Sequence, residues 1–178
     1  MSIGDMMFAI AEWLRSTWLV EFALWISETK ISLFIQTNFW IIPTLQTIHI
    51  LAIAATFSSV LMVNLRILGF AGKSRTIPQV VNRYYPWVWW GLLVLLCSGL
   101  GLTIGEPIRE LMNGAFWIKM ALVSCAALIA LGFYRKTRAA VGSTGDVASG
   151  GTKLGAVLIT LLWMVIMVLG RWIAYVPT

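Results

Sequence analysis

Four long apolar stretches constrain the fold of this chain more than any other feature. They cover roughly residues 40–63, 86–105, 115–134 and 154–174. Each is long enough to cross a hydrocarbon core, which takes about 20 residues of helix. None alternates apolar and polar residues with the period of two that a barrel strand requires. The sequence therefore predicts an all-α integral membrane protein, in which a four-transmembrane-helix bundle makes up a single membrane domain over residues 1–178.

Composition supports this class and limits the partners. Hydrophobic residues make up 60% of the chain and charged residues only 11%, far outside the usual range of soluble proteins. The formal net charge is +6, but the bases lie at the ends of apolar stretches and not along one face with interleaved aromatic residues. We therefore expect the lipid bilayer as the main partner and no binding of nucleic acid.

The connections between the stretches differ in charge. In order, they carry Arg66, Lys73, Arg75 and Arg83; then Glu106, Arg109 and Glu110; then Arg135, Lys136, Arg138 and Lys153 with Asp146. By the positive-inside rule the first and third connections face the cytoplasm. Both termini and the second connection then face outward from a bacterial inner membrane, which the chain crosses as a multi-pass protein. Residues 139–153 are rich in small residues, and we expect a flexible cytoplasmic linker there.

Residues 1–37 precede the first stretch and present no coherent polar face. Polar residues fall on two opposite sides of a helical wheel: Asp5, Glu12 and Ser16 on one side, Glu21 and Glu28 on the other. Two short amphipathic helices with a break near residues 16–17 resolve this conflict. Trp13, Trp18 and Trp25 favour the headgroup level, so we expect both helices on the outer membrane surface. The alternative is one tilted helix packed against the bundle.

The only histidine of the chain, His49, lies inside the first apolar stretch. It comes nine residues after Trp40, which places it about 14 Å below the interface, and Gln46 lies one turn before it on the same face. An ionisable side chain within a span marks a candidate functional site. His49 could be a metal or haem ligand, or handle protons or a quinone. Alternatively, it is hydrogen-bonded to a Ser, a Thr or a carbonyl of a neighbouring helix.

Two bases are expected near the same membrane surface as His49. Lys119 begins the third stretch beside Trp117, and Arg171 ends the fourth beside Trp172. Their long side chains could simply reach the headgroups. They could instead form an anion clamp for the propionates of a haem b whose iron faces His49. A single histidine allows a five-coordinate haem, or a second ligand from a methionine or another subunit.

A copper site is a further alternative. Met164 and Met167 lie three residues apart on one face of the fourth stretch, and thioethers together with His49 suit Cu(I). Methionine is equally an ordinary filler of apolar cores. The small residues Ser98, Gly99, Gly101 and Gly105 would let the second stretch approach a neighbouring helix or a flat ring closely.

Three local patterns resemble a family of small, functionally uncharacterised bacterial four-helix membrane proteins. They are His49 in the first span, Asn64-Leu65-Arg66-Ile67-Leu68-Gly69 at the cytoplasmic end of that span, and Phe116-Trp117-Ile118-Lys119 at the start of the third. The resemblance covers about residues 39–135. More distantly, the layout resembles the copper-resistance D family and the bacterial four-helix protoporphyrinogen oxidase, which implies copper passage or haem and porphyrin chemistry at His49 and Lys119. The chain departs from the closer family at Asn64, where Asp is frequent, and from the distant relatives in lacking a second histidine.

The sequence thus predicts a small membrane subunit or redox protein, not an enzyme by itself, with an outer-leaflet pocket around His49 for haem b or a quinone. One alternative is a copper or small-solute permease of the copper-resistance D type. Another is a purely structural membrane anchor that docks a partner complex or forms a homo-oligomer.

Overall fold

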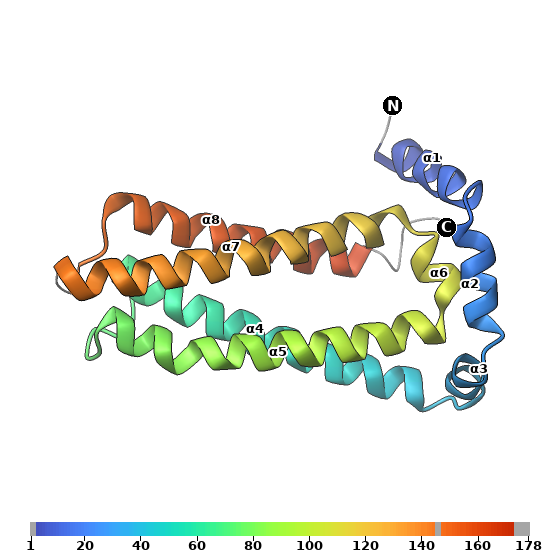
Figure 1. Ribbon diagram of the computed structural model, residues 1–178, viewed down its shortest axis with the longest axis horizontal. Helices are drawn as coiled ribbons and strands as arrows, with labels where there is room; N and C mark the ends of the chain where they lie inside the picture. Colours follow the sequence, from blue (N-terminus) through green and yellow to red (C-terminus); the bar gives the residue numbers. More distant parts are fainter. Residues whose placement is uncertain (1–2, 145–146, 173–178) are drawn as a thin grey trace. The chain divides into compact units, whose positions relative to one another are not determined.

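The computed structural model describes residues 3–144 and 147–172, and Figure 1 shows the order of their helices. These described residues form eight α-helices and no strand: α1 (Ile3–Arg15), α2 (Leu19–Ser27), α3 (Lys30–Thr37), α4 (Ile41–Leu68), α5 (Ile77–Gly105), α6 (Pro107–Leu111), α7 (Gly114–Thr144) and α8 (Gly150–Trp172). The all-α prediction is confirmed.

Four of the described helices are long and apolar enough to cross a membrane. They are α4, α5, the Gly114–Thr137 part of α7, and α8. These helices coincide with the four apolar stretches of the sequence, which indicates a multi-pass membrane protein. Because α7 continues to Thr144 and α8 begins at Gly150, helix extends into both ends of the expected linker at 139–153. Residues 145–146 of that linker lie outside the described residues.

Helix α5 begins at Ile77, well before the predicted start at residue 86. Thr76 and Gln79 form a reciprocal cap: the Thr76 amide donates to Gln79 Oε1 at 3.0 Å, and the Gln79 amide donates to Thr76 Oγ1 at 3.4 Å. This capping box satisfies two backbone donors that a helix start leaves without partners. Pro86 lies inside α5, where it removes one backbone donor without ending the helix.

Helix α4 ends in a motif that the sequence also carries. Gly69 has a positive φ of 84°, which glycine adopts without strain. Its amide donates to the carbonyl of Arg66 at 3.1 Å, and the Phe70 amide donates to the carbonyl of Leu65 at 2.9 Å. These two bonds make a Schellman motif. The glycine of the Asn64–Gly69 pattern therefore terminates the helix.

The chain divides into two compact units, and each is described by itself. The first comprises residues 1–50, 94–121 and 166–178, and the second residues 51–93 and 122–165. In the second unit, parts of α4, α5, α7 and α8 pack around one apolar core. Its buried members are Val63, Ile67, Ile77, Val80, Val81, Ala130, Tyr134, Ala148 and Ala156.

In the first unit, residues 3–37 form three helices, so neither the two-helix nor the one-helix expectation is correct. The predicted break falls between α1 and α2, where Thr17 Oγ1 donates to the Leu14 carbonyl at 2.6 Å. A second break precedes α3, because Thr29 caps that helix by accepting a hydrogen bond from the Ser32 amide at 3.3 Å. Thr29 is a helix-start signal that the helical-wheel pattern of residues 1–37 does not reveal.

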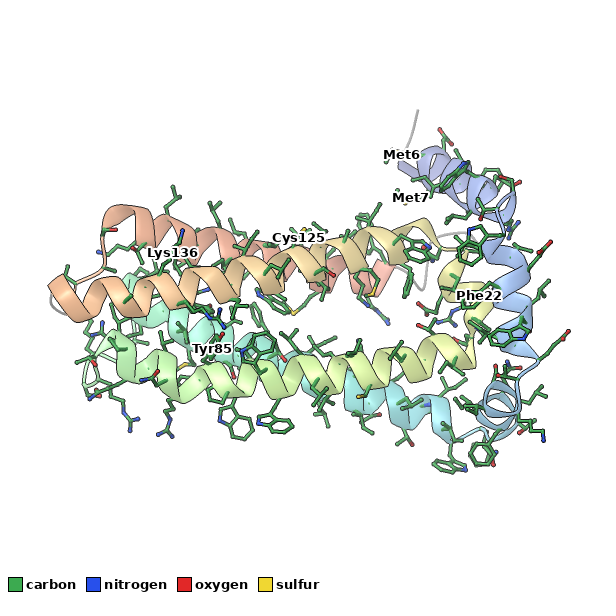
Figure 2. The ribbon with its side chains drawn as sticks, in the orientation of Figure 1. Met6, Met7, Phe22, Tyr85, Cys125 and Lys136 are labelled. Atoms are coloured by element: carbon green, nitrogen blue, oxygen red, sulfur yellow. The ribbon has the colours of Figure 1, made fainter. Side chains whose placement is uncertain are left out.

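Helices α2 and α3 are anchored to other parts of the first unit. Helix α2 lies against α6 (Figure 1), and Ala23 packs there with Leu111 and Met112 in a buried cluster. The Ser32 hydroxyl on α3 donates to the carbonyl of Ile104 near the end of α5 at 2.6 Å. Phe22 of α2 (Figure 2) is exposed and contacts two exposed tryptophans: its ring is tilted against that of Trp18, which precedes the helix, and stacks on that of Trp25.

Candidate functional site around His49

His49 on α4 is hydrogen-bonded to Ser98 on α5, and both residues belong to the first unit. The distance from His49 Nδ1 to Ser98 Oγ is 2.8 Å. Ser98 is buried, and its hydroxyl lies 2.6 Å from the carbonyl oxygen of Val94 one turn earlier. This bond matches the alternative prediction for His49, in which a Ser or Thr of a neighbouring helix is its hydrogen-bond partner.

The geometry at Ser98 favours a proton on Nδ1 of His49. A carbonyl oxygen can only accept, so the single Ser98 hydroxyl proton is donated to Val94. Ser98 Oγ must then accept from His49 Nδ1–H, which leaves Nε2 without a proton and with its lone pair available. Metal-ligating histidines commonly donate their other ring N–H in this way, because the bond fixes both tautomer and orientation.

Glycines on α5 bring this helix close to its neighbours. A Cβ added at Gly99 would lie 3.5 Å from His49 Cε1, an ordinary contact. A Cβ at Gly101 would lie 3.0 Å from Leu45 Cδ1, and one at Gly105 would lie 2.8 Å from Ile35 Cγ2. The small residues of this segment thus serve close helix packing around His49.

Lys119 on α7 belongs to the same unit and interacts electrostatically with His49. Its side chain passes over Gly170 of α8, where an added Cβ would lie 3.7 Å from Lys119 Nζ. Lys119 also interacts with the carboxyl group of Glu110 on α6. Ionisable side chains of α4, α6 and α7 therefore belong to the same unit.

Glu110 on α6, which the sequence presents only as a charge in the second connection, is partly withdrawn from solvent in the structure. Its side chain is 15% exposed, and burial raises the pKa of Glu110 above its usual value. Arg109 and Lys119 oppose that rise, while Glu106 adds to it. Arg109 lies 2.9 Å from Glu106 Oε2 and 3.8 Å from Glu110 Oε1, so its closer partner is Glu106.

The other predicted site residues are less involved. Gln46 is exposed on α4, and the structure records no hydrogen bond between it and His49. Arg171 is exposed near the end of α8, directly after the glycine that faces Lys119.

The three residues of the copper alternative, His49, Met164 and Met167, do not all belong to one unit. Met164 is 44% exposed and belongs to the second unit, whereas Met167 and His49 belong to the first. Within residues 3–144 and 147–172 there is also no group of three His, Cys, Asp or Glu side chains that could hold a metal ion. Cys97 and Cys125 are both free and exposed.

The second unit contains a buried polar network at Asn64. The Asn64 side chain donates to Thr160 Oγ1 on α8 at 2.8 Å, and Tyr134 Oη on α7 donates to Asn64 Oδ1 at 3.0 Å. Thr160 Oγ1 in turn donates a hydrogen bond to the Ala156 carbonyl at 2.9 Å. Nearby on α4, Arg66 Nε donates to the Arg75 carbonyl at 2.7 Å. Residues of the Asn64–Gly69 pattern therefore link α4 by hydrogen bonds to α7, to α8 and to the loop between α4 and α5.

The second unit also has a small cavity between α5, α7 and α8. One of its lining residues, Tyr85, is labelled in Figure 2. It is lined by Tyr85, Val88, Trp89, Leu92, Ala127, Ala130, Leu131, Tyr134 and Trp163. The buried Trp163 Nε1 has no hydrogen-bond partner among the described residues. The lining is almost wholly apolar, so this cavity offers few groups for recognising a polar ligand.

Comparison with known proteins gives one match. The model of a family of unknown function (DUF6644) matches residues 22–176. This agrees with the resemblance to an uncharacterised family and extends beyond residues 39–135, which carry the three local patterns. No curated protein and no solved structure matches the chain.

Proposed function

The chain belongs to the family of unknown function DUF6644, and we propose that it is a small integral membrane redox protein that binds haem b at His49. The observation that carries this proposal is the hydrogen bond from His49 Nδ1 to Ser98. It leaves Nε2 as a lone-pair donor in a segment where a polar group needs a partner. A haem bound there would supply one-electron chemistry.

A porphyrin suits this donor set better than a bare metal ion does. Among the described residues there is no group of three His, Cys, Asp or Glu side chains that could hold a bare metal ion. A porphyrin brings four nitrogen ligands of its own and needs only one from the protein. With one histidine in the chain, the haem would be five-coordinate or take its sixth ligand from a methionine or another subunit.

The charges near His49 suit a ligand that carries carboxylates. Lys119 belongs to the same unit as His49, and its side chain lies over Gly170 of α8, where an added Cβ would lie 3.7 Å from Lys119 Nζ. Arg171 follows Gly170 and adds a second cation. Lys and Arg side chains are the usual partners of carboxylate groups. We assign Lys119 and Arg171 to the propionates, with Gln46 at the edge of the site.

A quinol is the second candidate, and the same nitrogen favours it. An unprotonated Nε2 accepts a hydrogen bond from a quinol hydroxyl but cannot donate one to the carbonyl of an oxidised quinone. The proposal for this ligand is therefore restricted to the reduced form.

We also propose an orientation, from the charges of the connections. The basic connections between α4 and α5 and between α7 and α8 face the cytoplasm of a bacterial inner membrane, and both termini and α6 face outward. The exposed Trp13, Trp18 and Trp25 then hold α1 and α2 at the outer membrane surface. Labelling of single cysteines by a membrane-impermeant maleimide, in a background without Cys97 and Cys125, tests this: position 28 should react in intact cells and position 74 should not.

An absorption spectrum of the protein purified in detergent tests the haem proposal. We expect a Soret band that His49→Ala removes and that Thr47→Val retains, because the Thr47 hydroxyl donates to the Pro43 carbonyl of its own helix, at 2.8 Å. A colourless, iron-free protein that takes up no added haemin would refute haem binding. Extraction of a quinol from that same preparation would favour the second candidate.

A further inference from the structure

The second unit carries positive charge without opposing negative charge. Its described residues include no acid, and the one acid in its part of the sequence, Asp146, lies outside the described residues. Several of its basic side chains are exposed, and we call them the basic end: Lys73, Arg75, Arg83, Arg135, Lys136 and Lys153.

These cations lie at one end of the unit because the segments that carry them share one apolar core. Ile67 near the end of α4, Ile77 at the start of α5, Tyr134 on α7 and Ala148 just before α8 all belong to that core. The basic end consists of residues next to these core members in sequence. It is therefore a single surface formed by four segments of the chain.

The backbone beneath this surface is held in place by buried contacts. Arg66 is buried, and its Nε donates to the Arg75 carbonyl at 2.7 Å, which fixes the loop between α4 and α5. Gly72 packs over the same side chain, since an added Cβ would lie 3.4 Å from Arg66 Cδ. A backbone that is already ordered lowers the entropy cost of binding a ligand.

The basic residues of α7 are held in the same way. Arg135 and Lys136 lie between Tyr134, whose Oη donates to Asn64 Oδ1 at 3.0 Å, and the buried Thr137. The two cationic side chains are exposed while the residues on both sides of them are buried. The structure thus directs both cations outward from a fixed part of the helix.

No internal carboxylate competes for these cations. Among the described residues, the ion pairs recorded are those of Arg15 with Glu12 and of Arg109 with Glu106 and Glu110, and none includes a member of the basic end. An anion that binds there gains charge-assisted hydrogen bonds without displacing a carboxylate of the protein.

An exposed aromatic face adjoins the basic end on α5. Arg83, Trp87 and Trp90 follow one another at spacings of four and three residues, so they lie on one face of the helix. Trp87 is 62% exposed and Trp90 is 66% exposed. Tryptophan rings favour the headgroup level of a bilayer. This face therefore places two apolar rings beside a cation, which suits a ligand with an anionic head and an apolar tail.

We propose that the basic end is a binding site for an anionic phospholipid. The lipid phosphate contacts the cations of the basic end, and one acyl chain lies along Trp87 and Trp90. Clusters of Lys and Arg at the ends of transmembrane helices are typical sites for acidic lipid headgroups. A soluble phosphate compound would use the cations but not the tryptophans, so a phospholipid fits more of the surface. The inference does not depend on haem at His49, which belongs to the first unit.

Native mass spectrometry of the detergent-purified protein tests this with two lipids that differ only in their headgroup. The probes are phosphatidylglycerol, which is anionic, and phosphatidylcholine with the same acyl chains, which has no net charge. We expect phosphatidylglycerol to bind at least about tenfold more tightly, because several cations contribute. The preference should weaken as the ionic strength rises. Equal affinities for the two lipids would overturn the inference.

Lys136→Gln and Lys30→Gln are the matched variants, because both remove one exposed lysine and change the net charge equally. Lys30 lies at the start of α3, in the first unit. We expect Lys136→Gln to lower the affinity for phosphatidylglycerol about fivefold, the effect of one cation near a charged headgroup. Arg83→Gln should have a similar effect, and Lys30→Gln should have none. Equal losses in Lys30→Gln and Lys136→Gln would show a general charge effect and refute a site.

A soluble competitor distinguishes a phospholipid from a soluble phosphate compound. Glycerophosphoglycerol is the headgroup of phosphatidylglycerol without its acyl chains, and it should not displace the lipid at equal concentration. Trp90→Leu should weaken lipid binding without changing the binding of this headgroup. Full displacement by glycerophosphoglycerol, together with unchanged lipid affinity in Trp90→Leu, would assign the basic end to a soluble phosphate compound and refute the phospholipid.

Discussion

His49 donates its Nδ1 proton to Ser98 across 2.8 Å, between α4 and α5. The Ser98 hydroxyl lies 2.6 Å from the Val94 carbonyl oxygen, and donation of its proton there leaves Ser98 Oγ to accept from His49. The same contact that satisfies a polar group within an apolar helix thus presents Nε2 as a ligand. A structural and a ligand-binding role of His49 are compatible, and variants of Ser98 separate them.

Ser98→Ala removes the acceptor of the His49 ring proton. If Nε2 binds haem iron, we expect haem affinity to fall about 10- to 100-fold, the usual effect of losing a partner that orients a metal ligand. Thr103→Val is the matched control, because Thr103 Oγ1 donates to the Gly99 carbonyl of its own helix, at 3.0 Å. Haemin titration monitored at the Soret band measures both affinities, and equal losses in the two variants would contradict an orienting role.

Gly91→Ala tests a close approach of α4 and α5 in the second unit. Thr56 Oγ1 occupies the space that a Cβ at Gly91 would need, and Thr56 is fully buried. Overpacking of this kind lowers the free energy of unfolding by about 1–3 kcal/mol. Gly132 on α7 has no atom within 4 Å of an added Cβ, so Gly132→Ala should not destabilise the protein.

The double variant Thr56→Ala/Gly91→Ala decides whether Thr56 is the cause. The Thr56 hydroxyl has no hydrogen-bond partner among the described residues, so its removal breaks no recorded bond. We expect the double variant to be more stable than Gly91→Ala alone, since the overlapping atom is gone. Unfolding in denaturing detergent, followed by circular dichroism, gives the free energies of unfolding of the wild type, the two single variants and the double variant. Additive losses would assign the effect to another neighbour.

The four spanning helices could be predicted from sequence because their signal is long and repeated. A stretch of about 20 apolar residues has few alternatives to a transmembrane helix. Helix ends depend on a few residues and were predicted less well. Two helix ends have signals in the sequence that the hydropathy pattern alone does not reveal. They are the Thr76 and Gln79 capping box at the start of α5 and Gly69 at the end of α4.

The candidate site was only partly predictable. His49 and Lys119 stand out because they are ionisable residues in apolar stretches, and the structure brings them into one unit. Glu110 did not stand out, because it lies in a polar connection and its burial depends on how α6 packs beside α2. The role of Ser98 was equally hidden, since a serine in a span forms its commonest bond with its own helix.

Tyr134→Phe tests the polar network of the second unit. Tyr134 donates to Asn64 Oδ1 at 3.0 Å, and both residues are buried. Loss of this donor leaves a buried acceptor without one partner, which costs about 1–3 kcal/mol of unfolding free energy. Tyr85→Phe is the control, because Tyr85 lines the same cavity as Tyr134 but is not bonded to Asn64. Equal stabilities of the two variants would show that the bond contributes little.

The pH dependence of stability tests the environment of Glu110 without any ligand. Burial raises the pKa of its carboxyl in the folded state, against the opposing effects of Arg109 and Lys119. Between the usual glutamate pKa and the raised value, the folded state therefore binds more protons than the unfolded state does. The contribution of Glu110 to stability is then complete below the usual value and is lost as the pH rises through the raised value. Relative to Glu110→Gln, the wild-type free energy of unfolding should thus decrease with rising pH across this window, whereas Glu106→Gln should follow the wild type. A wild-type curve parallel to that of Glu110→Gln would mean that the Glu110 carboxyl is as well solvated in the folded protein as in the unfolded chain.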